Sequence, residues 1–153
     1  MELKESQQAA RDFVPEVEAF LGALPITREK FSIRVNRCDG TEGEQRDDIY
    51  HIWVGLRGVA PGNDVAAILD GLHARWRDAG WTITRYRRLD NGGVNLAATD
   101  PATGNGYTLD SGFEPAPDAY VVGFFNTPCY QSPSGKVDFG EIDSRTAGIG
   151  LVR

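Results

Sequence analysis

Apolar side chains recur every three or four positions between residues 3 and 24, the period of an amphipathic helix that packs on a core. Phe13, Val17 and Leu21 define this stripe. Pro15 interrupts the pattern, because proline lacks a backbone donor and crowds the preceding turn. We therefore expect either a helix that begins near residue 15 or a longer helix with a kink there.

A second helical period runs through residues 61–80, where Leu69 and Trp76 share one face. Asn63 is the expected N-cap, since its side chain can accept a hydrogen bond from a free backbone N–H. Gly80 suits the left-handed conformation that commonly follows a helix. These signals predict a helix that begins just after Asn63 and ends just before Gly80.

Apolar and polar residues alternate along the remaining segments, which is typical of half-buried strands. The expected strands cover residues 30–38, 49–57, 81–89, 94–100, 107–113 and 119–129. Their short connections, such as the Asn91-Gly92 turn, favour antiparallel pairing. The sequence thus predicts an α+β fold in the order α-β-β-α-β-β-β-β. We expect a twisted antiparallel sheet of five or six strands with the two helices packed on one face.

The chain has 153 residues, which is enough for one domain with its own core. We expect residues 1–130 to form this single α+β domain. Residues 131–153 contain Gly, Ser and Asp and show little periodicity, which predicts a loosely ordered C-terminal tail.

The formal net charge of −6 argues against sequence-independent binding of nucleic acid and against adhesion to anionic lipid. No run of about 18 apolar residues occurs, so we expect no membrane span. Residues 1–13 lack the apolar segment of a signal peptide. Two compartments stay open at this point: the cytoplasm, or a location outside it that is reached with an export signal absent from the given sequence.

The two cysteines bear on this choice. Cys38 ends the first expected strand and Cys129 ends the last. If these strands run in the same direction, their ends can meet in a disulfide, as in an exported protein; otherwise the chain holds two unpaired thiols, as in a cytosolic one. Their spacing alone does not decide between these alternatives, and it matches neither a Cys-x-x-Cys redox motif nor a metal-binding pattern.

Several stretches between residues 31 and 133 resemble a loose group of small secreted proteins and lipoproteins of actinomycetes. The stretches are "RCDG" followed by a polar loop, "IYHIWVGLRGV", "ILDGLHARWRDAGWTITRYRR", "LAATDPATGNGYTLDSG" and "FNTPCYQSP". The resemblance implies an extracytoplasmic α+β domain, in the cell envelope or secreted, in which Cys38 and Cys129 form a disulfide. It implies no particular activity, because the group has none generally assigned.

Candidate catalytic groups are few. The histidines are His51 and His73, and no nucleophile elbow, phosphate loop or dinucleotide fingerprint is present. A thiol paired with a histidine is the one cysteine-based option, and a disulfide would remove it. We therefore expect no catalytic residue, no metal site and no cofactor.

Candidate binding residues fall into two sets. Five acidic residues occupy the expected polar loop at residues 39–48: Asp39, Glu42, Glu44, Asp47 and Asp48. They do not match the calcium-loop pattern, which favours a solvated loop over a metal site. Trp53, Phe125 and Tyr130 are candidates for a surface or groove, although packing in the core is the favoured interpretation for such aromatics.

The leading functional hypothesis is a non-catalytic binding protein of the cell envelope or the secreted fraction. We expect a monomer that acts on a protein partner, as immunity or inhibitor proteins do. The alternative is a small-molecule or lipid carrier, which predicts an apolar pocket between helix 61–80 and the sheet. A third hypothesis is an enzyme that uses His51 or a thiol, which predicts a cleft where that group meets a carboxylate.

Overall fold

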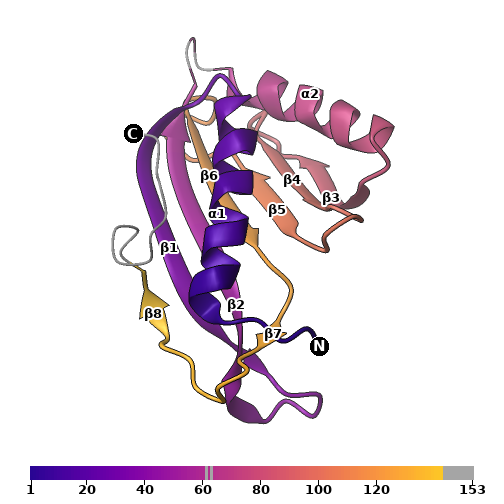
Figure 1. Ribbon diagram of the computed structural model, residues 1–153. Coiled ribbons are helices and arrows are strands. Elements are labelled where there is room, and N and C mark those ends of the chain that lie inside the picture. The colour runs from indigo at the N-terminus through magenta and orange to yellow at the C-terminus, as the bar shows by residue number, and fades with distance from the viewer. Residues whose placement is uncertain (61, 63, 143–153) are drawn as a thin grey trace.

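The computed structural model describes residues 1–60, 62 and 64–142, and these residues form two helices and a sheet of eight strands (Figure 1). The helices are α1 (Ser6–Gly22) and α2 (Val65–Asp78). The strands are β1 (Thr27–Asp39), β2 (Gln45–Val59), β3 (Thr82–Arg88), β4 (Val94–Thr99), β5 (Gly106–Asp110), β6 (Tyr120–Asn126), β7 (Tyr130–Gln131) and β8 (Gly140–Glu141). The predicted α+β fold and element order are confirmed, and two short strands add to the expected number.

The strands follow the order β3-β4-β5-β6-β2-β1-β8, and β7 pairs with β2. Every pairing between these strands is antiparallel. Since β1 and β6 both run antiparallel to β2, they run in the same direction and their C-terminal ends approach the same rim. The sheet curves behind α1, and both helices lie on the same side of it (Figure 1).

Helix α1 contains Pro15 within its span, so the longer of the two expected helices is the one observed, and a start near residue 15 is wrong. The buried face carries Phe13, Val14 and Val17. Burial of such side chains stabilises the fold by about 1.5–3 kcal/mol each, which readily outweighs the backbone hydrogen bond lost at Pro15. Packing on the sheet therefore holds the helix together across the proline.

Helix α2 ends as its sequence predicts. Gly80 has φ +81°, and the N–H of Trp81 donates to the carbonyl of Trp76 over 2.9 Å, which is the Schellman arrangement. The two indoles stack with centroids 5.1 Å apart, so the cap also supplies an apolar contact. The expected N-cap, Asn63, lies outside the described residues; Asp64 occupies the N-cap position before Val65 and makes no side-chain capping bond.

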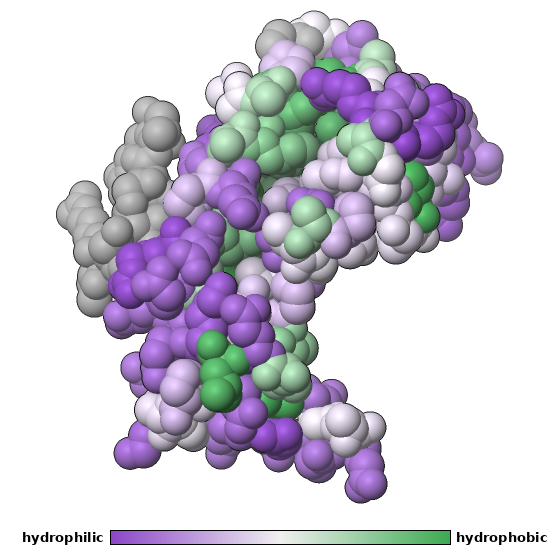
Figure 2. All heavy atoms as spheres, turned by 45° about the vertical axis from the view of Figure 1, so that its right-hand side comes forward, coloured by the Kyte–Doolittle hydropathy of each residue, from purple (hydrophilic) through white to green (hydrophobic). Residues whose placement is uncertain are grey.

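An aromatic cluster fills the space where the two helices meet the sheet. Phe20 of α1 lies 5.8 Å from Trp76 of α2 and 5.7 Å from Phe125 of β6, measured between ring centroids. Tyr107 of β5 contacts the same rings. The outer sides of the helices are polar, whereas apolar atoms gather in the hollow between them (Figure 2).

The hairpin formed by β1 and β2 is longer than expected, and the prediction of a polar loop over residues 39–48 is wrong for half of that segment. Strand β2 begins at Gln45, which leaves residues 40–44 as the turn. Polar pairs take the place of apolar alternation here: Arg37 bonds Asp47 across the strands, and Arg46 bonds Asp48. Such a segment carries no apolar period, so its extended conformation is not visible in the sequence.

Part of the expected tail contacts the sheet. Gln131 of β7 pairs with Ile49, Gly140 of β8 pairs with Val35, and Ser132 is only 3% exposed. The predicted domain boundary at residue 130 thus falls within β7. The rest of the predicted tail, residues 143–153, lies outside the described residues.

Candidate functional site

The sheet has a second face, which turns away from the two helices and which we call the outer face. Strand alternation decides which side chains lie on it. On β2, Ile52 and Val54 are fully buried towards the helices, so Trp53 and Arg57 project from the opposite side. On β6, Phe125 points inward and its neighbour Phe124 points outward.

Five side chains of the outer face form what we call the aromatic–arginine cluster: Arg34, Trp53, Arg57, Tyr120 and Phe124. The rings of Trp53 and Phe124 lie 5.7 Å apart, and the guanidinium of Arg57 lies 4.8 Å above the ring of Tyr120. Arg34 stands beside Trp53 in the β1–β2 register. Phe124 is 39% exposed, which is unusual for a large apolar side chain on a sheet.

Gly55 explains how Trp53 is held in this cluster. The β2–β6 register places Gly55 opposite Phe124. A Cβ atom at Gly55 would lie 2.3 Å from Cη2 of Trp53, so the indole lies in space that only glycine leaves free. The missing Cβ therefore lets the indole lie against the backbone of β2, where the ring of Phe124 contacts it.

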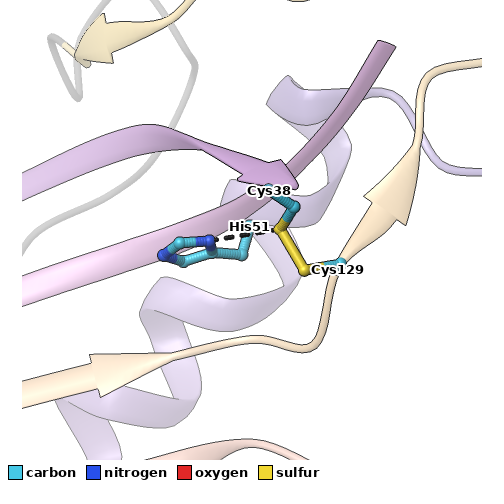
Figure 3. Close-up of side chains that lie close together, drawn as sticks. All are labelled: Cys38, His51 and Cys129. Atoms are coloured by element: carbon cyan, nitrogen blue, oxygen red, sulfur yellow. Dashed lines mark hydrogen bonds between the residues drawn. A yellow bond between two sulfur atoms is a disulfide. The ribbon is translucent and has the colours of Figure 1, made fainter. Parts of the chain in front are cut away.

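A disulfide joins Cys38 and Cys129 at the edge of the sheet where β1 and β6 end, with Cα atoms 6.3 Å apart (Figure 3). This confirms the pairing that the resemblance implied. Cys38 ends β1 and Cys129 follows β6, and the common direction of these strands brings the two sulfurs together. The disulfide also means that neither cysteine is a free thiol nucleophile.

His51 contacts this disulfide from the neighbouring strand. Its Nδ1 lies 3.4 Å from Sγ of Cys38, and burial lowers the pKa of His51 below its ordinary value. In the described part of the chain no carboxylate bonds to His51, so the group lacks the acidic neighbour expected of an enzyme. The ligand atoms of Cys38, His51 and Cys129 lie within 4.8 Å of one another, but sulfurs bonded to each other do not offer the thiolates that a metal requires.

The predicted acidic residues do not act as one cluster. Asp47 and Asp48 are engaged by arginines of the same hairpin, and Arg46 holds the pKa of Asp48 below its ordinary value. Glu44 accepts a hydrogen bond from the N–H of Glu42 at the turn, and Asp39 is exposed. Within the described residues, no three of these carboxylates bring their oxygens together as a metal site would.

The three predicted aromatics separate. Trp53 lies half-buried on the outer face, and its role as a contact residue stays a prediction. Phe125 is fully buried, so its proposed place at a surface or groove is wrong; strand alternation gives that position to Phe124 instead. Tyr130 is half-buried beside Tyr50, with the ammonium of Lys4 4.9 Å from its ring. Sequence reasoning missed Phe124, Tyr120, Arg57 and Arg34. Alternation along "SIRVN" and "IWVGLR" could have indicated the two arginines, whereas "YVVGFFN" has adjacent apolar pairs and does not show which face each aromatic takes.

The layer between α2 and the sheet, where a carrier would need its pocket, is occupied by side chains. Trp76, Leu69 and Leu72 of α2 are at most 5% exposed, and Trp76 contacts Tyr107 of the sheet. Pockets lie elsewhere in the described residues. One of about 120 Å³ lies between α1 and the loops near Asn105, and it is smaller than a typical ligand cavity of ~300 Å³ or more. Another of about 440 Å³ lies between the start of α1 and residues 134–138, and its lining is polar and charged, unlike the apolar pocket that a carrier of lipid would need.

None of the described helices is both long and apolar enough to cross a membrane. No protein-family model matches the chain, and the comparisons found no curated protein and no solved structure similar to it. The resemblance to actinomycete envelope proteins therefore stays an expectation.

Proposed function

We propose that this chain is a non-catalytic binding protein of the cell envelope or the secreted fraction, which uses the outer face of its sheet to contact a protein partner. The observation that carries the proposal is the contact between the rings of Trp53 and Phe124, on a face that neither helix covers, with arginines beside them. Trp, Tyr and Arg are the residues most enriched among those that dominate binding energy. An immunity or inhibitor role is the form of binding that we favour.

The charges of the cluster indicate what kind of partner fits. The chain as a whole is acidic, with a net charge of −6, but the aromatic–arginine cluster contains two cations and no anion. Arg57 lies 3.7 Å from Glu29. Arg34 is exposed and stands opposite Glu141 in the β1–β8 register, and no ion pair of Arg34 is found among the described residues. A partner surface with carboxylates around an apolar centre would complement this arrangement.

The disulfide supports the proposed compartment. Disulfides form and persist in oxidising environments and are rare in the cytosol, where thiols are kept reduced. A contact surface beside a disulfide therefore suits a protein that works outside the cytoplasm.

A matched pair of exposed phenylalanines tests the proposed surface. Phe124 is 39% exposed within the cluster, and Phe113 is 42% exposed in the segment between β5 and β6. The purified chain would serve as bait for proteins of the envelope and secreted fractions of its source cells, and Kd would then be measured for each variant with the protein retained. We expect Phe124→Ser to raise Kd at least ~30-fold, since a central hot spot contributes ~2 kcal/mol or more, and Phe113→Ser to leave it unchanged.

A second variant tests the electrostatic part of the proposal. Arg34→Glu should slow association and make it less sensitive to salt, because steering by opposite charge acts mainly on the association rate. Two results would place the contact surface elsewhere. One is an equal change of Kd in Phe124→Ser and Phe113→Ser. The other is a Kd that changes neither in Phe124→Ser nor in Trp53→Ser.

A further inference from the structure

The two sulfurs of the disulfide differ in their surroundings. Cys38 is 6% exposed, at the end of a strand in the sheet, whereas Cys129 is exposed in the segment that follows β6. The imidazole of His51 contacts the buried sulfur: Nδ1 lies 3.4 Å from Sγ of Cys38, and the ring approaches that end of the S–S bond (Figure 3). The disulfide therefore has one accessible end and one end beside a hydrogen-bonding group.

This asymmetry determines how the bond would react with a thiol. In thiol–disulfide exchange a thiolate attacks one sulfur along the S–S axis, and the other sulfur leaves as a thiolate. The rate depends on access to the attacked sulfur and on how well the leaving thiolate is stabilised. Here the more exposed cysteine is Cys129, which favours attack there. Burial disfavours a thiolate on Cys38, and a hydrogen bond from His51 would offset that cost, so the two effects together select the same direction.

We propose that the Cys38–Cys129 disulfide is a thiol-exchange site, at which a low-molecular-weight thiol modifies Cys129 and releases Cys38. The bond between the two protein sulfurs breaks, a bond between the incoming sulfur and Cys129 forms, and the electron pair leaves on Cys38. The number of disulfides is unchanged, so no oxidant or further reductant takes part. His51, in the tautomer that protonates Nδ1, donates a hydrogen bond to the Cys38 thiolate, which then takes its proton from solvent.

The sheet provides a scaffold that exchange does not dismantle. Strand β1 pairs with β2 from Thr27 to Asp39, and β6 pairs with β2 from Tyr120 to Asn126, through backbone bonds that do not involve the sulfurs. Exchange thus releases one tether between the end of β1 and the segment after β6. The product is a folded chain that carries a mixed disulfide on Cys129.

The direction of attack can be read from peptide masses. Trypsin cleavage after arginine and lysine places Cys38 in residues 38–46 and Cys129 in residues 89–136, so the two cysteines separate. The oxidised full chain would be treated with 2-mercaptoethanol, quenched rapidly in acid, alkylated with N-ethylmaleimide and digested. We expect the mercaptoethanol adduct on the Cys129 peptide and the maleimide on the Cys38 peptide, in at least ~10-fold excess over the reverse pattern.

The contribution of His51 is tested by rate. His51→Phe keeps a planar ring but removes the donor, and we expect exchange to slow by about tenfold, the value of one hydrogen bond to a charged sulfur. His51→Asn retains a donor near the position of Nδ1 and should restore part of the rate. His73→Phe, on α2 and away from the disulfide, is the matched control and should leave the rate unchanged.

Circular dichroism would show that each variant is folded, and the peptide masses from the unaltered chain do not depend on any variant. Adducts on Cys38, an even distribution between the two cysteines, or no adduct at millimolar thiol would each overturn the proposal. An unchanged rate in folded His51→Phe would overturn the role assigned to His51.

Discussion

Loss of the Cys38–Cys129 bond should lower the free energy of unfolding by an amount that follows from the chain it closes. The two cysteines are 91 residues apart in the sequence. Cross-linking residues at this separation removes denatured-state entropy worth about 4.6 kcal/mol at 25 °C on the loop-closure model. Since domains of this size are stable by only about 5–15 kcal/mol, the disulfide would supply a large share of the total.

Urea unfolding of the oxidised protein and of the same protein in a dithiol reductant provides the measurement. With a slope of about 2 kcal/mol per molar urea, the midpoint should fall by ~2 M on reduction. The slope itself should rise, because the denatured chain expands once the cross-link is gone. A double variant, Cys38→Ala with Cys129→Ala, is the control and should unfold identically with and without reductant.

A loss below ~2 kcal/mol with an unchanged slope would refute the loop-entropy reasoning. It would mean that the reduced denatured chain keeps the ends of β1 and β6 close together. A transition that ceased to be cooperative in the reductant would instead show that the disulfide holds two separately stable parts of the sheet in one unit.

Three further predictions concern local features. Phe125→Ala should cost about 3–5 kcal/mol in urea unfolding, because its ring is fully buried, whereas Phe124→Ala beside it should cost under ~1 kcal/mol. Gly80→Ala should lower the free energy of unfolding by about 1–2 kcal/mol, since φ is +81° there. Gly71→Ala, within α2 and in open space, should raise that free energy by ~0.5–1 kcal/mol, and thermal unfolding of both variants would show the opposite shifts of the midpoint. Burial lowers the pKa of His51, so the unfolded chain binds its proton more readily than the folded one. Stability should therefore fall as the pH drops below about 6.5, and a pH series of urea unfolding should show this slope reduced in His51→Phe.

The sequence predicts those parts of the fold in which burial imposes a period. Helix α2, with its stripe and its terminal Gly80, appears where expected, and antiparallel order follows from short turns. It does not predict the far end of the β1–β2 hairpin, because Arg37, Asp47 and their neighbours satisfy one another across strands without an apolar face. Strands β7 and β8 have two residues each, too few to show any period.

The candidate site was less accessible to sequence reasoning than the fold. "GFFN" contains two adjacent phenylalanines, and only the register against β2 determines that Phe125 enters the core and Phe124 faces outward. The place of Trp53 over Gly55 depends on a missing Cβ whose effect is visible only in three dimensions. The contact of His51 with Cys38 likewise arises because the two residues meet across neighbouring strands, 13 positions apart in the chain.

The strand order has a consequence for how the chain folds. The six longer strands form two units of successive strands: the hairpin β1–β2, and the meander from β3 to β6. The pairing of β2 with β6 joins these two units, and it is the pairing among the six between strands that are not consecutive in the chain. Two local units can thus form early, and they become one sheet only when β6, the last of the longer strands along the chain, reaches β2. The amide hydrogens of this seam, from Trp53 to Val59, should exchange with solvent last, because only global unfolding separates them.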